Sequence, residues 1–332
     1  MTPGLSEDTG YGTRFEVMNV SMWKDAIMGV VVGDALGCPV QFESREEVER
    51  HPVLSMRGYG TFNLPAGSWT DDSSLTLALL ESIKRTGGID CKDIMDNFVR
   101  WLDDGEFTPY GYAYDIGRGT MSAIHRYKRD HKPQEAGNVD ERSNGNGSLM
   151  RIMPAVLYCI GKRLPDSEAI DIIHKVGSLT HAHIRSNIAC GLYFFMAASI
   201  LSGEGSLNGR LQDGLDRGFA FYEDSLADQE NLRYYDRLRD LTAFADQSED
   251  AIRSSGYVVD AIEAAVWALV KTDSFQSALL RAVNLGDDTN TVGAIAGGLA
   301  GLYYGFEAIP ADWVAALQRR EWIEALVSGL DR

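Results

Sequence analysis

Apolar side chains recur every three to four positions along most of the chain, and this spacing constrains the fold more than any other feature. Between Trp23 and Ala35 the apolar residues share one face of a helix, because 3.6 residues make one turn. Further faces of this kind lie within 75–83, 94–102, 172–176, 188–196 and 258–270. Convincing alternation of apolar and polar residues, the mark of a half-buried strand, is missing. We therefore predict an all-α fold, a compact single-domain bundle of many helices.

Three segments interrupt the helical pattern. Residues 1–20 are polar and aperiodic, so we predict a flexible N-terminal tail there and one domain over 21–332. Residues 130–147 are rich in glycine and asparagine and contain a proline, which predicts a loop. Residues 202–255 are highly charged, and we predict a second loop there, with 231–244 as a candidate helix.

Charge and cysteine usage limit the partners and the compartment. The formal net charge is −17, and such a surface repels nucleic-acid backbones and anionic membranes, so we expect neither as a partner. The four cysteines form no Cys-x-x-Cys pair, which argues against a zinc site or a disulfide framework. No basic start followed by an apolar run is seen, so we expect a cytoplasmic protein. An anionic substrate would need local positive charge at its own site.

Two acidic motifs each open a helix. The first places Thr70, Asp71 and Asp72 before an apolar helix, and the second, Leu285–Val292, contains Asp288, Asn290 and Thr291. Helix capping alone explains either motif seen singly. Together their carboxylates and hydroxyls are hard oxygen ligands that suit Mg²⁺ or Ca²⁺. If the two helix starts face each other, a pair of divalent cations between them would supply the counter-charge that buried carboxylates need.

Glycines are frequent around these motifs. The helix after the second motif carries Gly293, Gly297, Gly298 and Gly301, a spacing that permits close contact between helices. Asp115–Thr120 and Asn144–Ser148 are glycine-rich turns before helical segments, where free backbone N–H groups can bind phosphate, and Arg118 could add positive charge. Either turn could equally be structural. His181 and His183 would point apart on a helix, so we expect no shared zinc site.

In their order along the chain these segments resemble the ADP-ribosylglycohydrolase family, which contains the dinitrogenase-reductase-activating glycohydrolase. The resemblance runs from about Trp23 to Tyr304. It is carried by Gly29–Pro39, Trp69–Ser73, Tyr114–Gly117, Asn146–Arg151, Thr180-His181 and Asn284–Gly305. It implies an all-α fold with two metal ions, Mg²⁺ or Mn²⁺, beside a cleft for ADP-ribose.

The resemblance also assigns residues. The metal ligands it implies are Thr70, Asp71, Asp72, Asp288 and Thr291, with Asn290 in the same motif. Asp71 and Asp72 are both candidates for the general base. The substrate contacts it implies are Asp115, Gly117, Gly119, Ser148 and His181.

The chain departs from the family pattern at two positions. Asn290 stands where the family usually has aspartate, so one metal should bind less tightly, because an amide oxygen brings no charge. Gln41 stands where an acid is common, four residues after Gly37, and Glu43 lies two residues further on. In the family that acid has a role near the attacking water.

The implied activity is hydrolysis of the N-glycosidic bond at C1 of the ribose in an ADP-ribosylated protein, with arginine as the expected acceptor. One alternative is a weak or inactive member that binds ADP-ribosylated protein, or that binds and inhibits an ADP-ribosyltransferase toxin through residues 1–20. Another alternative is a hydrolase of a different ADP-ribose linkage, such as one to serine. The acceptor touches only the rim of the cleft, so the sequence does not separate these.

Overall fold

The computed structural model describes residues 11–224, 229–328 and 330, and in this part of the chain it is all-helical and has no β-strand. The predicted all-α fold is confirmed. The first eight α-helices are α1 (Tyr11–Gly37), α2 (Arg45–Arg50), α3 (Asp71–Thr86), α4 (Cys91–Asp104), α5 (Arg118–Asp130), α6 (Met153–Gly161), α7 (Asp166–Gly177) and α8 (Ile184–Ser202). The remaining eight are α9 (Leu207–Glu223), α10 (Gln229–Leu232), α11 (Leu241–Ala245), α12 (Val258–Val270), α13 (Phe275–Val283), α14 (Thr289–Tyr304), α15 (Ala311–Ala316) and α16 (Arg320–Val327). Six short 3₁₀ helices join them: Cys38–Val40, Pro133–Glu135, Leu149–Arg151, Arg233–Arg239, Glu249–Ala251 and Phe306–Ala308.

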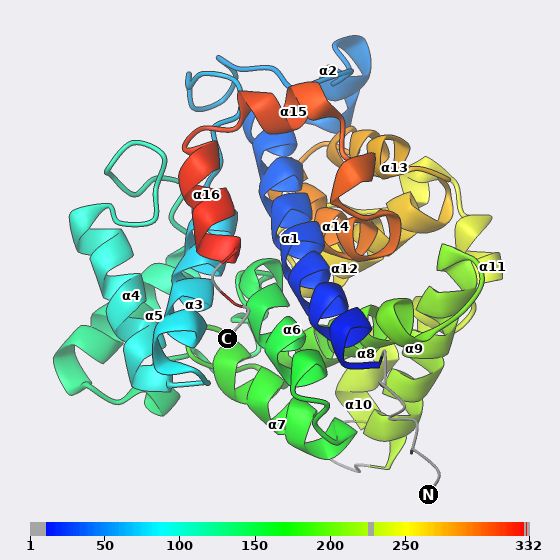
Figure 1. Cartoon of the computed structure of the whole chain (residues 1–332). Helices are drawn as coiled ribbons and strands as arrows, with labels where there is room; N and C mark the ends of the chain where they lie inside the picture. Colours follow the sequence, from blue (N-terminus) through cyan, green and yellow to red (C-terminus); the bar gives the residue numbers. More distant parts are fainter. Residues whose placement is uncertain (1–10, 225–228, 329, 331–332) are drawn as a thin grey trace, which may run out of the picture.

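Helices α1 and α14 pack backbone against backbone in the middle of the bundle (Figure 1). A Cβ atom added to Gly29 would lie 2.1 Å from the carbonyl oxygen of Gly297, and one added to Gly33 would lie 2.0 Å from that of Gly293. Residue numbers fall along α14 as they rise along α1, so the two helices are antiparallel. The expectation that the α14 glycines serve close helix contact is confirmed.

The other helices surround this pair. Helices α3, α4 and α5 lie on one side, and α8, α9 and α12 lie on the other (Figure 1). Helix α8 is long and apolar enough to cross a bilayer by length and composition, but 83% of its most apolar window is buried inside the protein. Such burial is what the core helix of a globular bundle shows.

Two predicted boundaries differ from the structure. Helix α1 begins at Tyr11, so residues 11–20 are helical rather than a tail, and the spacing of Phe15, Met18 and Met22 in the sequence continues the helical pattern. Residues 1–10 lie outside the described part of the chain, and so does the tail predicted there. The side chains of residues 11–20 are not described either, so the predicted contact of residues 1–20 with a transferase stays a prediction. The loop predicted over 202–255 is wrong, because α9 and several shorter helices occupy it. Helix α9 buries Leu211, Leu215 and Phe219 on one face.

The α1–α14 contact leads to a stability prediction. In Gly33→Ala the new methyl group would overlap a backbone carbonyl that cannot rotate away, so the free energy of unfolding should fall by about 3 kcal/mol, as in other overpacked cores. Urea denaturation would measure it. Gly209→Ala in α9 is the matched control, because the nearest atom to its added Cβ is 3.5 Å away. It should leave stability unchanged or raise it by up to about 1 kcal/mol. Equal effects of the two substitutions would contradict the packing described.

Candidate metal and substrate site

The two acidic motifs meet where the N-termini of α3 and α14 face each other. Asn290 Nδ2 donates hydrogen bonds to Thr70 Oγ1 at 2.9 Å and to Asp72 Oδ2 at 3.1 Å, so residues 220 positions apart are in direct contact. All the side chains involved are buried. The structure thus brings together the two helix starts that the sequence singled out.

Asp34 on α1 supports this arrangement and was not among the predicted site residues. Its carboxylate accepts hydrogen bonds from the backbone N–H groups of Thr70 at 2.9 Å and Ser73 at 3.0 Å, and from both of their hydroxyls. It therefore caps α3, a role that the Thr70 side chain does not fill. Burial raises the pKa of Asp34 to about 7 against these hydrogen bonds. In the sequence, the signal that could have identified Asp34 is that it is the only acid in the apolar run from Met28 to Val40.

Asp115 joins the acid cluster. One carboxylate oxygen from each of Asp71, Asp72 and Asp115 lies within 4.8 Å of the others. Asp115 has a left-handed backbone, with φ of 53°, and accepts a hydrogen bond from Asn290 Nδ2 at 3.1 Å. The sequence resemblance put Asp115 with the substrate contacts. The geometry makes it a candidate metal ligand as well.

Burial and mutual repulsion dominate the electrostatics of the cluster. Burial first, and then the charges of Asp115 and Asp72, hold the pKa of Asp71 well above its usual range. Burial also raises the pKa of Asp72 far above normal and that of Asp288 to about 6. Within the described part of the chain no lysine or arginine forms an ion pair with these carboxylates. Such a site needs protons or bound cations to offset its charge.

The donor set fits a divalent cation with a preference for oxygen. Three buried oxygens in this region have no hydrogen-bond partner: Gln41 Oε1, Asp72 Oδ1 and Asn290 Oδ1. Carboxylate, amide and hydroxyl oxygens without nitrogen or sulfur are the ligands that Mg²⁺ and Mn²⁺ prefer. Thr70, Asp71, Asp72, Asp115, Asp288 and Thr291 are the other side chains that could take part. The residues therefore fit the two-metal centre that the family resemblance implies.

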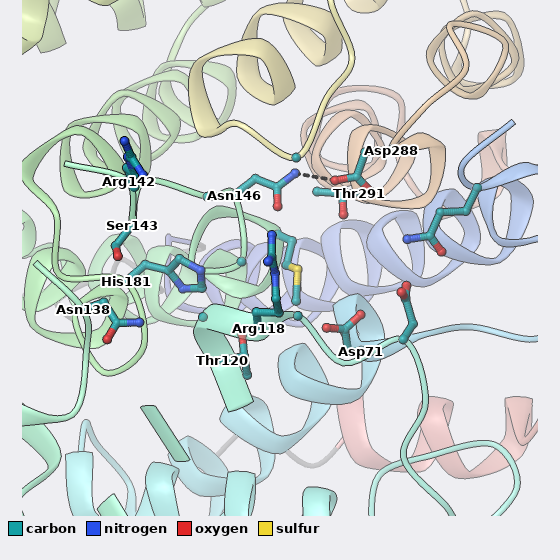
Figure 2. Close-up of a pocket in the computed structure, with 18 of the residues that line it drawn as sticks. Asp71, Arg118, Thr120, Asn138, Arg142, Ser143, Asn146, His181, Asp288 and Thr291 are labelled. Atoms are coloured by element: carbon teal, nitrogen blue, oxygen red, sulfur yellow. Dashed lines mark hydrogen bonds between the residues drawn. The ribbon is translucent and has the colours of Figure 1, made fainter. Parts of the chain in front are cut away.

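A cleft of about 860 Å³ extends from the acid cluster to the glycine-rich loops. Figure 2 shows Asp71, Asp288 and Thr291 toward one end, and Arg142, Ser143 and His181 toward the other. The two ends are tied together by Asn146, whose Nδ2 donates to Asp288 Oδ2 at 2.8 Å. The cleft thus joins a carboxylate-rich end to an end with Arg142 and a glycine-rich loop, with Arg118 between them, which suits a ligand with phosphates at one end.

The cleft separates the predicted residues into two groups. Asp71, Asp115, Gly117, Gly119 and His181 line it, as do Asp288 and Thr291, whereas Asp72, Thr70 and Asn290 lie behind its surface. Ser148 does not line the cleft, contrary to the expectation for its side chain. It is fully buried and contacts Cys190, because the chain turns into the core at the 3₁₀ helix Leu149–Arg151.

His181 is held as a neutral hydrogen-bond donor by two residues that sequence reasoning assigned no role. Buried Arg151 donates to Thr180 Oγ1 at 2.6 Å, and Thr180 Oγ1 lies 2.9 Å from His181 Nδ1. If the Thr180 hydroxyl donates to Nδ1, the ring hydrogen is on Nε2, which can then donate to a ligand. Nε2 packs beside Gly119 and Gly147. Burial, followed by the charge of Arg151, lowers the pKa of His181 to about 3.

Comparisons with known proteins agree with this geometry. The sequence profile described as ADP-ribosylglycohydrolase matches residues 21–332. ADP-ribosylarginine hydrolase Tri1 of Serratia proteamaculans is 32% identical over 310 residues, 92% of this chain and 78% of that protein. ADP-ribosyl-(dinitrogen reductase) glycohydrolase of Rhodospirillum rubrum is 30% identical over 316 residues, 92% of this chain and 96% of that protein. A solved structure described as an ADP-ribosylglycohydrolase-related protein complex has a TM-score of 0.74 at 32% identity, and covers 95% of this chain and 99% of its own.

Metal removal and pH should act on stability together. Asp34 and Asp288 have pKa values raised to about 7 and about 6, whereas an unfolded aspartate titrates near 3.9. Protonation therefore stabilises the fold, and in EDTA the melting temperature should fall as the pH rises from about 4 to about 7. Mg²⁺ or Mn²⁺ should reverse the fall, so the shift produced by metal should grow with pH. Thermal melts with and without metal at constant ionic strength test this, and a metal shift absent at every pH would contradict it.

Asn290→Asp should tighten metal binding. The substitution adds a carboxylate where the amide now contacts Thr70, Asp72 and Asp115, and ligand charge is a main determinant of affinity for divalent cations. We expect the Mg²⁺ dissociation constant, measured by calorimetry, to fall about tenfold. Asn138→Asp adds the same charge at the other end of the cleft and should have little effect. An unchanged or weaker affinity in Asn290→Asp would remove Asn290 from the metal site.

Proposed function

The chain belongs to the ADP-ribosylglycohydrolase family, and we propose that it is a Mg²⁺-dependent hydrolase that removes ADP-ribose from arginine side chains of a modified protein. The observation that carries this proposal is the charge layout of one cleft. Buried carboxylates lie at one end, Arg142 and the glycine-rich loop around Gly145 and Gly147 lie at the other, and Arg118 lies between them (Figure 2). ADP-ribose has matching parts, a ribose with hydroxyls and a pyrophosphate with negative charge.

Arginine is proposed as the acceptor because of the relatives. Tri1 proteins of Serratia proteamaculans and Pseudomonas putida are described as ADP-ribosylarginine hydrolases and are 32% and 34% identical to this chain. A serine-linked substrate is the second acceptor to test, because the sequence leaves a different ADP-ribose linkage open.

Different residues of the chain have different roles in the proposed hydrolysis. Divalent cations, when bound, supply counter-charge and Lewis-acid polarisation of oxygen ligands. Of the two candidates for the general base, Asp71 lines the cleft and Asp72 does not, so we assign Asp71 to accept a proton from the attacking water. The water oxygen bonds to ribose C1 as its proton passes to Asp71, the C1–N bond breaks with its electron pair going to nitrogen, and the neutral guanidine that leaves takes up a proton from solvent. Nearby carboxylates such as Asp115 favour the positive charge that develops on the ribose.

We assign the pyrophosphate of the substrate to the end of the cleft opposite the carboxylates. The backbone around Gly145 and Gly147 and the Nε2–H of His181 present donors to a pyrophosphate, and Arg118 and Arg142 add charge. Because the chain has a formal net charge of −17, an anionic substrate needs positive charge at its own site, and these groups supply it. His181 is not assigned to acid–base catalysis, because its low pKa keeps it neutral.

Two amides favour a second candidate function, binding of ADP-ribosylated protein with slow turnover. Asn290 and Gln41 both donate hydrogen bonds to Asp115, so neutral side chains occupy places where the family has acids. Fewer charges around a cation mean weaker occupancy. Incubation with arginine-ADP-ribosylated protein and Mg²⁺, followed by measurement of free ADP-ribose, separates the two functions. Release supports the hydrolase, and retention of the modified protein without release supports the binder.

Asp71→Ala should abolish turnover while the fold survives. We expect the rate of ADP-ribose release to fall by at least about a hundredfold, which is typical for loss of a general base. The melting temperature in EDTA should not fall, because the substitution removes an uncompensated buried charge. Asp166→Ala, at the first position of α7, is the matched control and should keep full activity. An active Asp71→Ala enzyme would contradict the role given to Asp71.

A further inference from the structure

Five aromatic rings form a continuous row beside the acidic end of the cleft. In order they are Phe42, Phe62, Tyr114, Tyr112 and Tyr110, and successive ring centroids lie 6.5, 5.4, 6.0 and 6.2 Å apart. The hydroxyls of Tyr114 and Tyr110 are anchored to the Trp69 carbonyl and to Ser68 Oγ. The inner part of this aromatic row is therefore fixed in place.

The aromatic row adjoins carboxylates and not the cationic end. Phe42 lines the cleft and follows Gln41, which hydrogen-bonds to Asp115, and Tyr114 immediately precedes Asp115. The backbone N–H of Phe42 donates to the carbonyl of Asp287 at 2.7 Å. Arg142 and His181 lie toward the opposite end of the cleft (Figure 2). A pyrophosphate is therefore drawn away from the aromatic row, whereas a cation is drawn toward it.

Phe42, at one end of the aromatic row, and Tyr112, which stacks on Tyr110 near the other end, are the most solvent-exposed rings of the row. Phe42 is 62% exposed and Tyr112 is 51% exposed. Elsewhere in the described chain lysine and arginine side chains lie over aromatic rings, such as Lys24 over Phe306 and Arg319 over Trp322. None of the described cations lies over the five rings of the row. The exposed rings of Phe42 and Tyr112 can therefore receive a cation from outside.

The backbone of Phe42 is also strained, although its side chain stays exposed to solvent. Its φ of 69° is in the left-handed region, which a bulky residue adopts only at a cost of about 1–3 kcal/mol. Two backbone hydrogen bonds of 2.7 Å, Phe42 N–H to Asp287 and Asp287 N–H to Glu43, hold it there. Folding alone does not explain an exposed ring kept in this conformation, whereas a role in binding does.

We propose that the aromatic row is the acceptor subsite, where Phe42 receives the guanidinium of the ADP-ribosylated arginine and Tyr112 contacts the arginine stem or its neighbours further out. This inference rests on the proposed hydrolase function and names the residues that determine its acceptor. The guanidinium keeps its positive charge when glycosylated, so ring faces and nearby carboxylates both attract it. A serine acceptor is neutral and gains neither interaction. The row would thus select arginine.

Steady-state kinetics on an arginine-ADP-ribosylated peptide with Mg²⁺ would test the subsite. Phe42→Leu keeps an apolar side chain but loses the ring, and we expect kcat/KM to fall about tenfold, with a smaller loss of about threefold for Tyr112→Leu. The dissociation constant of free ADP-ribose, measured by calorimetry, should stay within about twofold of wild type. Tyr304→Leu, a partly exposed tyrosine at the far end of α14, is the matched control and should change neither quantity.

Two outcomes would overturn the subsite. One is an unchanged kcat/KM in Phe42→Leu. The other is an equal loss of affinity for free ADP-ribose, which would assign the row to the adenine ring. Phe42→Gly separates folding from binding, since glycine accepts the positive φ: the melting temperature should hold or rise while kcat/KM falls. A lower melting temperature with unchanged kcat/KM would make Phe42 structural.

Failure of the proposed function can be told apart from failure of the subsite. If wild-type protein releases no ADP-ribose from the peptide, the hydrolase proposal fails. Binding then tests the subsite alone, using the modified peptide and free ADP-ribose as the two probes. The subsite predicts that wild type binds the peptide more tightly than ADP-ribose and that Phe42→Leu loses this difference. Equal affinities for both probes in wild type would overturn it.

Discussion

The backbone-to-backbone packing of α1 against α14 is the constraint on which the site depends. Gly29, Gly33 and Gly37 on one helix leave no room for a Cβ beside Gly297, Gly293 and Thr289 on the other. This contact sets the N-terminus of α14 beside the C-terminal part of α1. Asp34 projects from that part of α1 to cap α3. Two antiparallel helices thus bring three acidic segments, distant in sequence, to one point.

The acid cluster at this point concentrates negative charge in the buried interior, away from solvent. Burial, and then neighbouring carboxylates, raise the pKa values of Asp71, Asp72 and Asp288, and the protein supplies neutral donors: Asn290 for Asp72 and Asp115, and Asn146 for Asp288. An amide in place of an acid lowers repulsion in the metal-free protein and also lowers attraction for a cation. If metal binds here as proposed, Asn290 lowers metal affinity and eases the metal-free state, and an aspartate would shift this balance the other way.

Charge is separated along the cleft. The acids lie between a cationic, glycine-rich end and the aromatic row, so a ligand with phosphates at one end and a guanidinium at the other has a single favourable orientation. In the proposed binding mode, that orientation sets the bond between ribose and acceptor next to Asp71, one of the carboxylates that line the cleft. Recognition of both ends thus positions the bond to be broken, which is how binding energy contributes to catalysis.

The sequence alone determined the helical class, through a spacing that only helices satisfy, and it identified the two acidic helix starts and the glycines of α14, because each is a local pattern. It misjudged residues 202–255, where charge concealed the amphipathic period of α9. Only the tertiary structure decided which elements meet: Asp34 as the cap of α3, Asp115 within the acid cluster, Ser148 in the core and the aromatic row at the rim. These depend on the packing of α1, α14 and the loops around them, and contacts between residues far apart in the chain leave no periodic signal in one sequence.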